Sequence, residues 1–481
     1  MKQAQKSLVT AGGLLVVAGA VLGAALWVNR DVERQEKQKE DQAKLFAFDK
    51  AKVRSVRLEK GKDLVAEAVR DENGKPWRLV KPVQADADDA TVNAIVDKLA
   101  ELKQKKDLGG DTDPKQPGLD APRFKVTLAL DDKKEHGIEV GADNPFDSSM
   151  YVRKLGEKTV RIVEGWHKTP LDKSTFDLRD RRVARIEDAA EVRSASVTND
   201  NPYTLVKSGA DWKLTGPGHE TPEAADSSTA DRVVSTLKNL RATAVAAEGA
   251  FDEKKFGLHR PKVAVEIDLA VAGGKDTFRR KLAIGEATSK VYARRDDAKT
   301  VFEVDKAVLK DLAKDWFELQ DKTVAKFDRE QVRMLEIEAP GAAKVAVSRR
   351  KDAPPDGGYA DEKFAVEAPA SGAAKRWKIS SALYSLASLK AAAFATGKPK
   401  LDKPRVYTVK GEKDAVLARI TVGGPLPKND KRLYVMAEGK DRVYEVEKAT
   451  LDDLPKTLDD VLDTPPPAAA DGGTAAPQAK K

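Results

Sequence analysis

The sequence predicts an α+β protein in which an N-terminal transmembrane helix precedes three tandem modules, each a mostly antiparallel sheet covered by a helix. Three observations support this. A long uncharged segment lies near the start, at Leu8 to Val28. The same landmarks return with a period near 140 residues, since Leu119, Leu258 and Leu401 are 139 and 143 residues apart. Within each copy, apolar residues change from period two to helical spacing and back, which is typical of strands flanking a helix.

The first predicted element is a membrane span. Leu8 to Val28 comprises 21 residues without a charge, enough to cross a hydrocarbon core of about 30 Å at about 1.5 Å per residue. Lys2 and Lys6 precede it, so the positive-inside rule favours a single-pass protein of the inner membrane with a periplasmic bulk. The alternative is a cleaved signal peptide, whose apolar region is usually about 7 to 15 residues. We therefore expect an uncleaved signal anchor over 1–30.

The segments on either side of the modules are predicted from composition. Residues 31–45 are largely charged and contain no glycine or proline, which favours a solvated helical spacer. Residues 465–481 are rich in proline and alanine and predict a disordered tail. Gly19 and Gly23 have the spacing of a helix-pairing motif, although glycine is also common in spans for other reasons.

The repeat divides the chain into modules at 46–184, 185–325 and 326–464. Each copy is predicted to hold a tryptophan at the end of a short strand, then a pair of helical leucines, then a leucine before a proline. The matching residues are Trp77, Trp212 and Trp377; Leu99 with Leu102, Leu237 with Leu240, and Leu386 with Leu389; and Leu119, Leu258 and Leu401. A period this long has the size of an independent domain.

Within the first copy the elements follow from residue spacing. Asn73-Gly74 is a strong hairpin signal. Val92, Ile95, Val96, Leu99 and Leu102 form one helical stripe. Strands are predicted at Val53 to Leu58, Leu64 to Val69, Trp77 to Val80, Phe124 to Leu130, Ile138 to Val140, Met150 to Val152 and Val160 to Val163, and a final short helix near Leu171 to Leu178.

The sequence contains no motif for chemistry. There is no cysteine, and the four histidines (His136, His167, His219 and His259) lack the spacing of a zinc site. Neither a nucleophile elbow nor a phosphate loop occurs. We therefore predict no catalytic residue, no metal ligand and no cofactor, and we assign no ligand-binding residue. Asp86, Asp88 and Asp89 have two interpretations: calcium binding, or capping of the following helix, which their position favours.

Charge and aromatic content narrow the partners. The chain has 86 basic and 78 acidic residues and 6% aromatics, without a basic stripe interleaved with rings, so nucleic acid is not an expected ligand. The repeated tryptophans are either platforms for sugar rings or core residues beside leucine and isoleucine. We favour the core, and the same holds for Tyr151, Tyr292 and Tyr434.

Several first-copy motifs also carry a family resemblance. They are the N-terminal span, Leu45-Phe46-Ala47-Phe48-Asp49, Val53-Arg54-Ser55-Val56, Trp77-Arg78-Leu79, and Pro82 ahead of Asp86. This pattern resembles DUF4340, a bacterial family of unknown function. The resemblance implies a membrane-anchored envelope protein encoded beside ABC transporters of the type linked to gliding motility. It implies no catalytic or binding residue. The third copy departs most, with Lys400 where the others have Gly118 and Gly257.

The expected function is that of a non-enzymatic envelope protein, which serves as spacer and docking surface for an ABC-type transporter or envelope assembly. Repeated domains without reactive residues suit this role, because each copy adds reach and contact area. The alternative is an extracytoplasmic module that binds glycan or peptide for such a transporter, in a pocket with convergent polar groups. A hydrolase with an unmarked active site is a third hypothesis.

Overall fold

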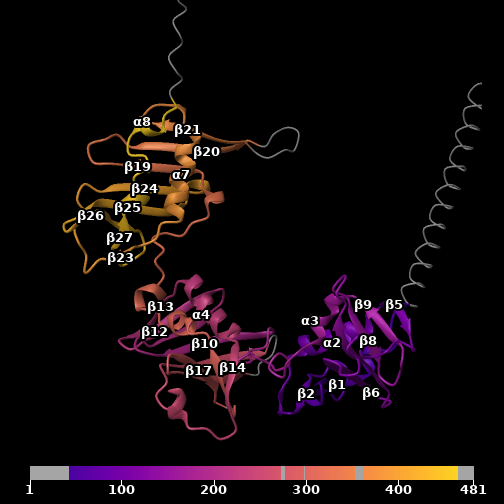
Figure 1. Cartoon of the computed structure of the whole chain (residues 1–481). Helices are drawn as coiled ribbons and strands as arrows, with labels where there is room; N and C mark the ends of the chain where they lie inside the picture. The colour runs from indigo at the N-terminus through magenta and orange to yellow at the C-terminus, as the bar shows by residue number, and fades with distance from the viewer. Residues whose placement is uncertain (1–42, 272–276, 297, 353–360, 464–481) are drawn as a thin grey trace, which may run out of the picture. The chain divides into compact units, whose positions relative to one another are not determined.

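The chain folds into three sheets of nine strands, one in each tandem module (Figure 1). The computed structural model describes residues 43–271, 277–296, 298–352 and 361–463. Every strand pair whose register is defined is antiparallel. The predicted three-module, sheet-rich architecture is therefore confirmed.

The first module has the strand order β4-β3-β2-β1-β6-β7-β8-β9-β5. Its main helix, α2 (Asp89–Ala100), follows β4, and the short α3 (Lys168–Leu171) follows β9. The strands are β1 (Val53–Lys60), β2 (Asp63–Val69), β3 (Arg78–Lys81), β4 (Ala85–Asp86), β5 (Gln104–Gly109), β6 (Phe124–Leu130), β7 (Glu135–Asp143), β8 (Met150–Lys154) and β9 (Val160–Val163).

The second module repeats this order as β13-β12-β11-β10-β15-β16-β17-β18-β14. Its helices are α4 (Ser227–Asn239), α5 (Ala307–Leu312) and α6 (Trp316–Leu319). The strands are β10 (Ala190–Thr198), β11 (Tyr203–Ser208), β12 (Asp211–Gly216), β13 (His219–Ala224), β14 (Ala242–Glu248), β15 (Val263–Val271), β16 (Thr277–Ala287), β17 (Lys290–Arg295) and β18 (Thr300–Val304).

The third module has the order β22-β21-β20-β19-β24-β25-β26-β27-β23 and the helices α7 (Arg376–Ala387) and α8 (Leu458–Val461). The strands are β19 (Met334–Glu338), β20 (Val345–Asp352), β21 (Asp361–Ala368), β22 (Gly372–Ala373), β23 (Ala393–Phe394), β24 (Arg405–Lys410), β25 (Val416–Leu426), β26 (Asn429–Ala437) and β27 (Tyr444–Glu447).

The main helix of each module connects the two edge strands of its sheet, β4 with β5, β13 with β14, or β22 with β23. It therefore crosses one face, as α7 does in Figure 1. In the first module its buried stripe of Val92, Ile95, Val96 and Leu99 belongs to the same hydrophobic cluster as the strand residues. The predicted cover of the sheet is confirmed there, and so is the stripe from Val92 to Leu99. Leu102, which was predicted to continue the stripe, lies just beyond the C-terminal end of the helix.

Each module is closed by two backbone contacts at the ends of its main helix. The segment that enters the module, called the leading segment, forms a backbone hydrogen bond just beyond the C-terminus of the helix. The segment that leaves the module, called the trailing segment, forms one at the N-terminus of the helix. The first set is Leu45 N–H to Leu102 O (2.8 Å), Val183 to Leu240 (2.9 Å) and Val324 to Leu389 (3.0 Å). The second is Asp88 N–H to Leu178 O (2.8 Å), Asp226 to Leu319 (2.8 Å) and Lys375 to Val461 (2.7 Å). Adjoining backbone contacts, which begin at Lys44, Arg182 and Thr323 and end at Asp180, Asp321 and Asp463, give the modules the bounds 44–180, 182–321 and 323–463.

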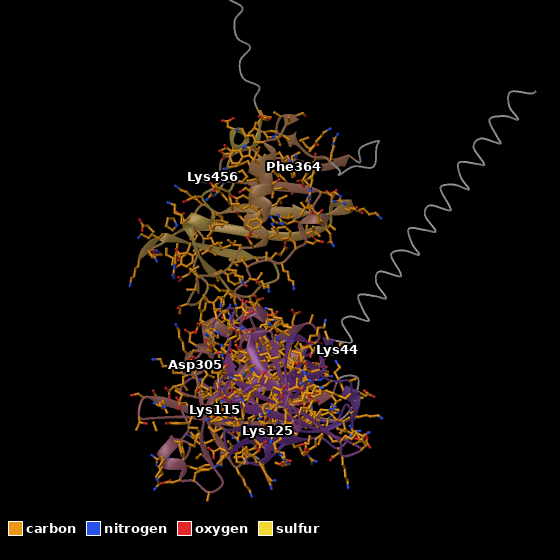
Figure 2. The ribbon with its side chains drawn as sticks, turned by 45° about the vertical axis from the view of Figure 1, so that its right-hand side comes forward. Lys44, Lys115, Lys125, Asp305, Phe364 and Lys456 are labelled. Atoms are coloured by element: carbon orange, nitrogen blue, oxygen red, sulfur yellow. The ribbon has the colours of Figure 1, made fainter. Side chains whose placement is uncertain are left out.

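The third tryptophan does not occupy the predicted position. Trp77 and Trp212 are buried core residues, as favoured, and their carbonyls accept from Ala87 and Ala225. In the third module the equivalent carbonyl, which accepts from Ala374, belongs to Phe364. Phe364 lies in the body of that module (Figure 2) and in its hydrophobic cluster. Trp377 instead lies in α7 with 67% of its surface exposed, so the predictions of a strand end and a core ring were wrong for this copy.

Other differences lie at the edges of the sheets. The predicted helix near Leu171 to Leu178 is displaced to α3, and a turn occupies the later residues. The strands β4 and β5 were not predicted, because β4 has two residues and β5 is largely polar and exposed. An edge strand needs no apolar alternation, since one side of it faces solvent.

The predicted span Leu8 to Val28, most of the spacer 31–45 and the tail 465–481 lie outside the described residues. Within the described ranges, no helix is long and apolar enough to cross a membrane.

Candidate functional site

The acidic group before the first helix is used for capping. Asp88 is the N-cap of α2, and its carboxylate accepts from the backbone N–H of Thr91 at 2.9 Å. The Asp89 carboxylate accepts from the backbone N–H of Trp77 at 2.6 Å, and Asp86 pairs with Arg185. These contacts confirm the capping interpretation for Asp88. Among the residues that the structure describes, no group of three or more acidic or histidine side chains could hold a metal ion.

Two of the four histidines are packed against aromatic rings of the first module. His136 stacks on Phe48 with ring centroids 5.2 Å apart, and burial lowers its pKa. His167 is buried against Trp166 at 3.6 Å, and burial likewise lowers its pKa. Both rings are therefore favoured in the neutral form by desolvation. His259 is exposed near the end of the leucine-proline segment.

His219 lines a pocket within the second module that sequence analysis did not identify. The pocket has a volume of about 210 Å³. Its wall comes from the β10–β11 connection, the start of β11, the β12–β13 turn, and the segment that leads into α6. The lining residues are Asp200, Asn201, Pro202, Tyr203, Pro217, His219, Lys314, Trp316 and Leu319.

Trp316 forms the aromatic wall of this pocket. The His219 ring stacks on it with centroids 4.2 Å apart and an interplanar angle of 19°. Its indole N–H donates to Glu223 Oε1 at 2.9 Å, and Gln320 Nε2 donates to the other carboxylate oxygen at 2.9 Å. Gly216 makes room for the ring, because a Cβ there would lie 2.8 Å from the indole. The ring is thus fixed by stacking, by a hydrogen bond and by a glycine contact.

The floor of the pocket is also held by hydrogen bonds. The buried Tyr203 hydroxyl donates to Leu312 O at 3.1 Å, and Asn199 Nδ2 donates to the same oxygen at 3.0 Å. Burial is the main cause of a strongly raised pKa of Tyr203, so the hydroxyl remains a donor at neutral pH. Besides Tyr203, the lining residues with polar or charged side chains are Asp200, Asn201, His219 and Lys314. Such an arrangement suits binding of a small polar molecule with one apolar face.

The pocket residues are specific to the second module. The trailing segments align at Leu178, Leu319 and Val461 through their equivalent backbone contacts. Trp316 therefore corresponds to Thr175 and Leu458. Ala87, Ala225 and Ala374 are also equivalent through their backbone contacts. Glu223 lies two residues before Ala225, and the same position is occupied by Ala85 in the first module and by Gly372 in the third. The signal available in the sequence was a tryptophan directly after a capping aspartate, Asp315, with Glu318 completing the capping box.

Comparisons with known proteins place the chain in a family. A family model described as "Domain of unknown function (DUF4340)" matches residues 77–261, 212–410 and 398–466. Two of the three matches begin at the buried tryptophans, Trp77 and Trp212. No curated protein and no solved structure matches the chain. Since the matches together cover most of the chain, this protein belongs to the DUF4340 family.

Proposed function

We propose that the protein is a membrane-anchored, non-enzymatic component of the cell envelope that acts as spacer and docking surface, accessory to an ABC-type transporter or envelope assembly. The observation that carries this proposal is how the chain passes through each module. It is bound at the C-terminal end of the main helix on the way in, at Leu45, Val183 and Val324. It is bound at the N-terminal end of that helix on the way out, at Leu178, Leu319 and Val461.

This path advances the chain by the length of a rigid helix in each module. The main helices have 12, 13 and 12 residues, which corresponds to about 18 to 20 Å each. The modules also follow one another without a linker. Only Arg181 separates the last bonded residue of the first module from Arg182, which already bridges to Arg241. Short connections and fixed internal advance are the properties that a spacer needs.

The anchor and the location rest on the sequence. The uncharged segment Leu8 to Val28, preceded by Lys2 and Lys6, supports an inner-membrane span with the modules in the periplasm. The transporter partner was expected from a resemblance to DUF4340. The family match supports that resemblance.

The test is crosslinking of the full-length protein in its native membrane, followed by mass spectrometry of the captured proteins. We expect ABC-type transporter subunits joined through module lysines. A second chain lacking residues 182–321 removes one whole module between its natural ends. We expect it to fold and reach the membrane but to lose or shift these crosslinks. Capture of envelope glycan without any transporter subunit would contradict the docking proposal.

The pocket in the second module favours a second candidate function, capture of one sugar unit of an envelope glycan. Its aromatic wall at Trp316 and its polar groups are the features that sugar rings contact, since the apolar ring face stacks and the hydroxyls bond. The probe is a soluble N-acetylglucosamine oligomer added to the full chain. We expect binding that Trp316→Ala abolishes and that Trp166→Ala, a change of an exposed ring in the first module, leaves intact. Equal binding by both variants would exclude this pocket.

A further inference from the structure

A second pocket, with a volume of about 220 Å³, lies where the first module continues into the second. Three segments form its wall. They are Gln84 to Asp86 at β4, the joining segment 179–185, and the end of β17 with the start of β18. The residues that line the pocket all belong to one compact unit of the chain. We call it the junction pocket.

The lining of the junction pocket is strongly basic. The lining residues with charged side chains are the cations Arg179, Arg182, Arg185, Arg295 and Lys299, and the carboxylates Asp86 and Asp180. Five cations against two carboxylates leave an excess of three positive charges. Glu248, which is outside the lining, pairs with Arg179 and reduces the excess to two. A concave site lined by one sign of charge attracts ligands of the opposite sign.

The two carboxylates hold two of the arginines in place. The Asp180 carboxylate accepts from Arg182 Nε and Nη2, both at 3.0 Å. Arg185 Nε lies 3.4 Å from the same carboxylate, and Arg185 also pairs with Asp86. Both guanidinium groups are therefore oriented without a ligand, which lowers the entropic cost of binding one.

Arg179 is the cation whose partners are fewest. It is 4% exposed, and its Nη2 forms an ion pair with Glu248 Oε1 at 2.7 Å. Within the described part of the chain, its guanidinium donates no hydrogen bond. A guanidinium carries several N–H donors in a planar fork, and buried donors that lack an acceptor cost free energy. Because Arg179 lines the junction pocket, an oxyanion bound there supplies the missing acceptors.

The second module shows how the same position is satisfied without a ligand. Gln320 is the counterpart of Arg179, since each pairs with the alanine two residues before its main helix. Gln320 Nε2 donates to Glu223 at 2.9 Å. The first module has Ala85 at the position of Glu223, and Ala85 lines the junction pocket. The first module therefore has a cation where the second has an amide, and lacks the carboxylate that partners the amide.

A phosphate monoester has the chemistry that fits this lining. It carries a charge of about −1.5 to −2 at neutral pH and presents several strong acceptor oxygens. That charge matches the excess of two positive charges that remains when Glu248 is included. Arginine forks bind phosphate oxygens through pairs of parallel hydrogen bonds, and clusters of arginine are a common way of recognising phosphate groups.

We propose that the junction pocket binds a phosphate monoester group, with Arg179 as the buried donor and with Arg182 and Arg185 as oriented donors beside it. The site goes beyond the proposed spacer role and does not depend on it. The phosphate belongs either to a soluble molecule or to a lipid headgroup, and the chemistry that the pocket recognises is the same in both.

The experiment is isothermal titration calorimetry of the full chain in detergent with three probes: inorganic phosphate, glycerol 3-phosphate and a short-chain phosphatidic acid. We expect saturable binding at one site. Binding of all three supports the proposal with the phosphate group alone as ligand. Binding of phosphatidic acid alone supports it with a lipid headgroup as the source.

Two variants place the binding in the junction pocket. Arg179→Gln and Ala85→Glu each introduce the residue that the second module has at that position. The first removes the buried donor, and the second supplies it with a carboxylate of the chain. We expect each to weaken binding roughly ten- to a hundredfold, because a charged hydrogen-bonding group is lost or occupied. Arg279→Gln is the matched control, since Arg279 is an exposed arginine paired with Asp268, and it should leave the affinity unchanged.

Two results overturn the proposal. One is the lack of saturable binding of any of the three probes to the natural chain. The other is equal affinity in the natural chain and in both variants, which would place the phosphate elsewhere. Hydrogen exchange of β1 and β6 checks that each variant keeps its fold, and Ala85→Glu carries the test if Arg179→Gln does not fold. The crosslinks expected of a docking surface do not depend on either result, so the two proposals fail separately.

Discussion

The first and third modules share one scaffold but place their aromatic residues differently. In the first, Trp77 is buried, and its indole N–H donates to Asn93 Oδ1 at 2.9 Å. In the third, Phe364 takes that position and needs no partner; the residue equivalent to Asn93 is Ser380. The repeat therefore preserves an aromatic volume on the strand. The polar partner on the helix is present where the ring has an N–H and absent where it does not.

The second module supports this relation. Trp212 donates from its indole to Asp231 Oδ1 at 2.7 Å, at the helix position of Asn93. The exposed faces of the main helices also differ between the first and third modules in the residues that form one contact. Asp97 on α2 pairs with Lys50 at 2.7 Å, whereas at the same two positions of the third module Arg329 lies over the Tyr384 ring at 5.1 Å. A charge pair in one copy is a cation–aromatic pair in another.

The largest expected effect comes from removing the shared core ring. Trp77→Ala and Phe364→Ala should each destabilise their own module by about 3–5 kcal/mol, because a fully buried aromatic leaves a cavity. Hydrogen exchange of the full chain, followed by module, measures this. Trp377→Ala is the matched control and should change protection little, since exposed substitutions stay within about 0.5 kcal/mol. A large loss of protection in Trp377→Ala would contradict the assignment of Phe364, rather than Trp377, as the equivalent of Trp77.

Acidification should weaken the second module through its helix cap. Burial disfavours the charged Asp226 carboxylate, but hydrogen bonds from Ser228 and from the Thr229 N–H outweigh it and lower its pKa to about 2. Because this lies below the unfolded value near 3.9, the stabilisation is present above about pH 4 and is lost as the pH falls towards 2. The expected loss is about 2 kcal/mol.

Urea denaturation of the full chain and of Asp226→Asn at pH 6 and pH 2.5 measures this effect. Asparagine keeps a capping acceptor without the charge, so the stability of the variant relative to the natural chain should rise on acidification. A constant difference between the two proteins would show that Asp226 does not contribute to the pH dependence.

The relation between Trp77 and Asn93 can be tested by a double-mutant cycle. Asn93→Leu leaves a buried indole N–H without its acceptor and should cost about 1–3 kcal/mol. Trp77→Phe, which imitates the third module, should recover most of that cost in the double variant. Additive losses would mean that the N–H and the amide do not act together.

The smallest expected effect is the difference in stability that the N-cap residues of α2 and α7 contribute. Asp88 caps α2 by accepting from Thr91, whereas Lys375 at the same position of α7 makes no side-chain cap bond. Asp88→Ala should therefore cost about 1 kcal/mol in the first module. Lys375→Ala should cost no capping energy, and hydrogen exchange of the first turns of α2 and α7 compares the two. Equal losses would indicate that the Lys375 ammonium contact with Asp459 O replaces a cap.

The sequence alone determined the features that depend on local spacing. The helical stripe from Val92 to Leu99, the strand at Phe124 to Leu130 and the period near 140 residues follow from side chains that must face one core. The match of Tyr151, Tyr292 and Tyr434 was also correct. The three residues lie in equivalent strands, β8, β17 and β26, which pair with β9, β18 and β27. The absence of a catalytic motif could be stated from the sequence, but a binding pocket could not.

Only the tertiary structure decided which residues are equivalent and which are exposed. Trp377 is followed by Lys378 and Ile379 much as Trp77 is followed by Arg78 and Leu79, yet Trp377 lies on a helix. Its place was fixed by the backbone contact that aligns Phe364 with Trp77, a contact between segments that local pattern does not relate. The pocket at Trp316 likewise joins four segments of the second module. Residues distant in sequence meet because strand pairing and helix packing bring them together, and that information is held by the whole fold.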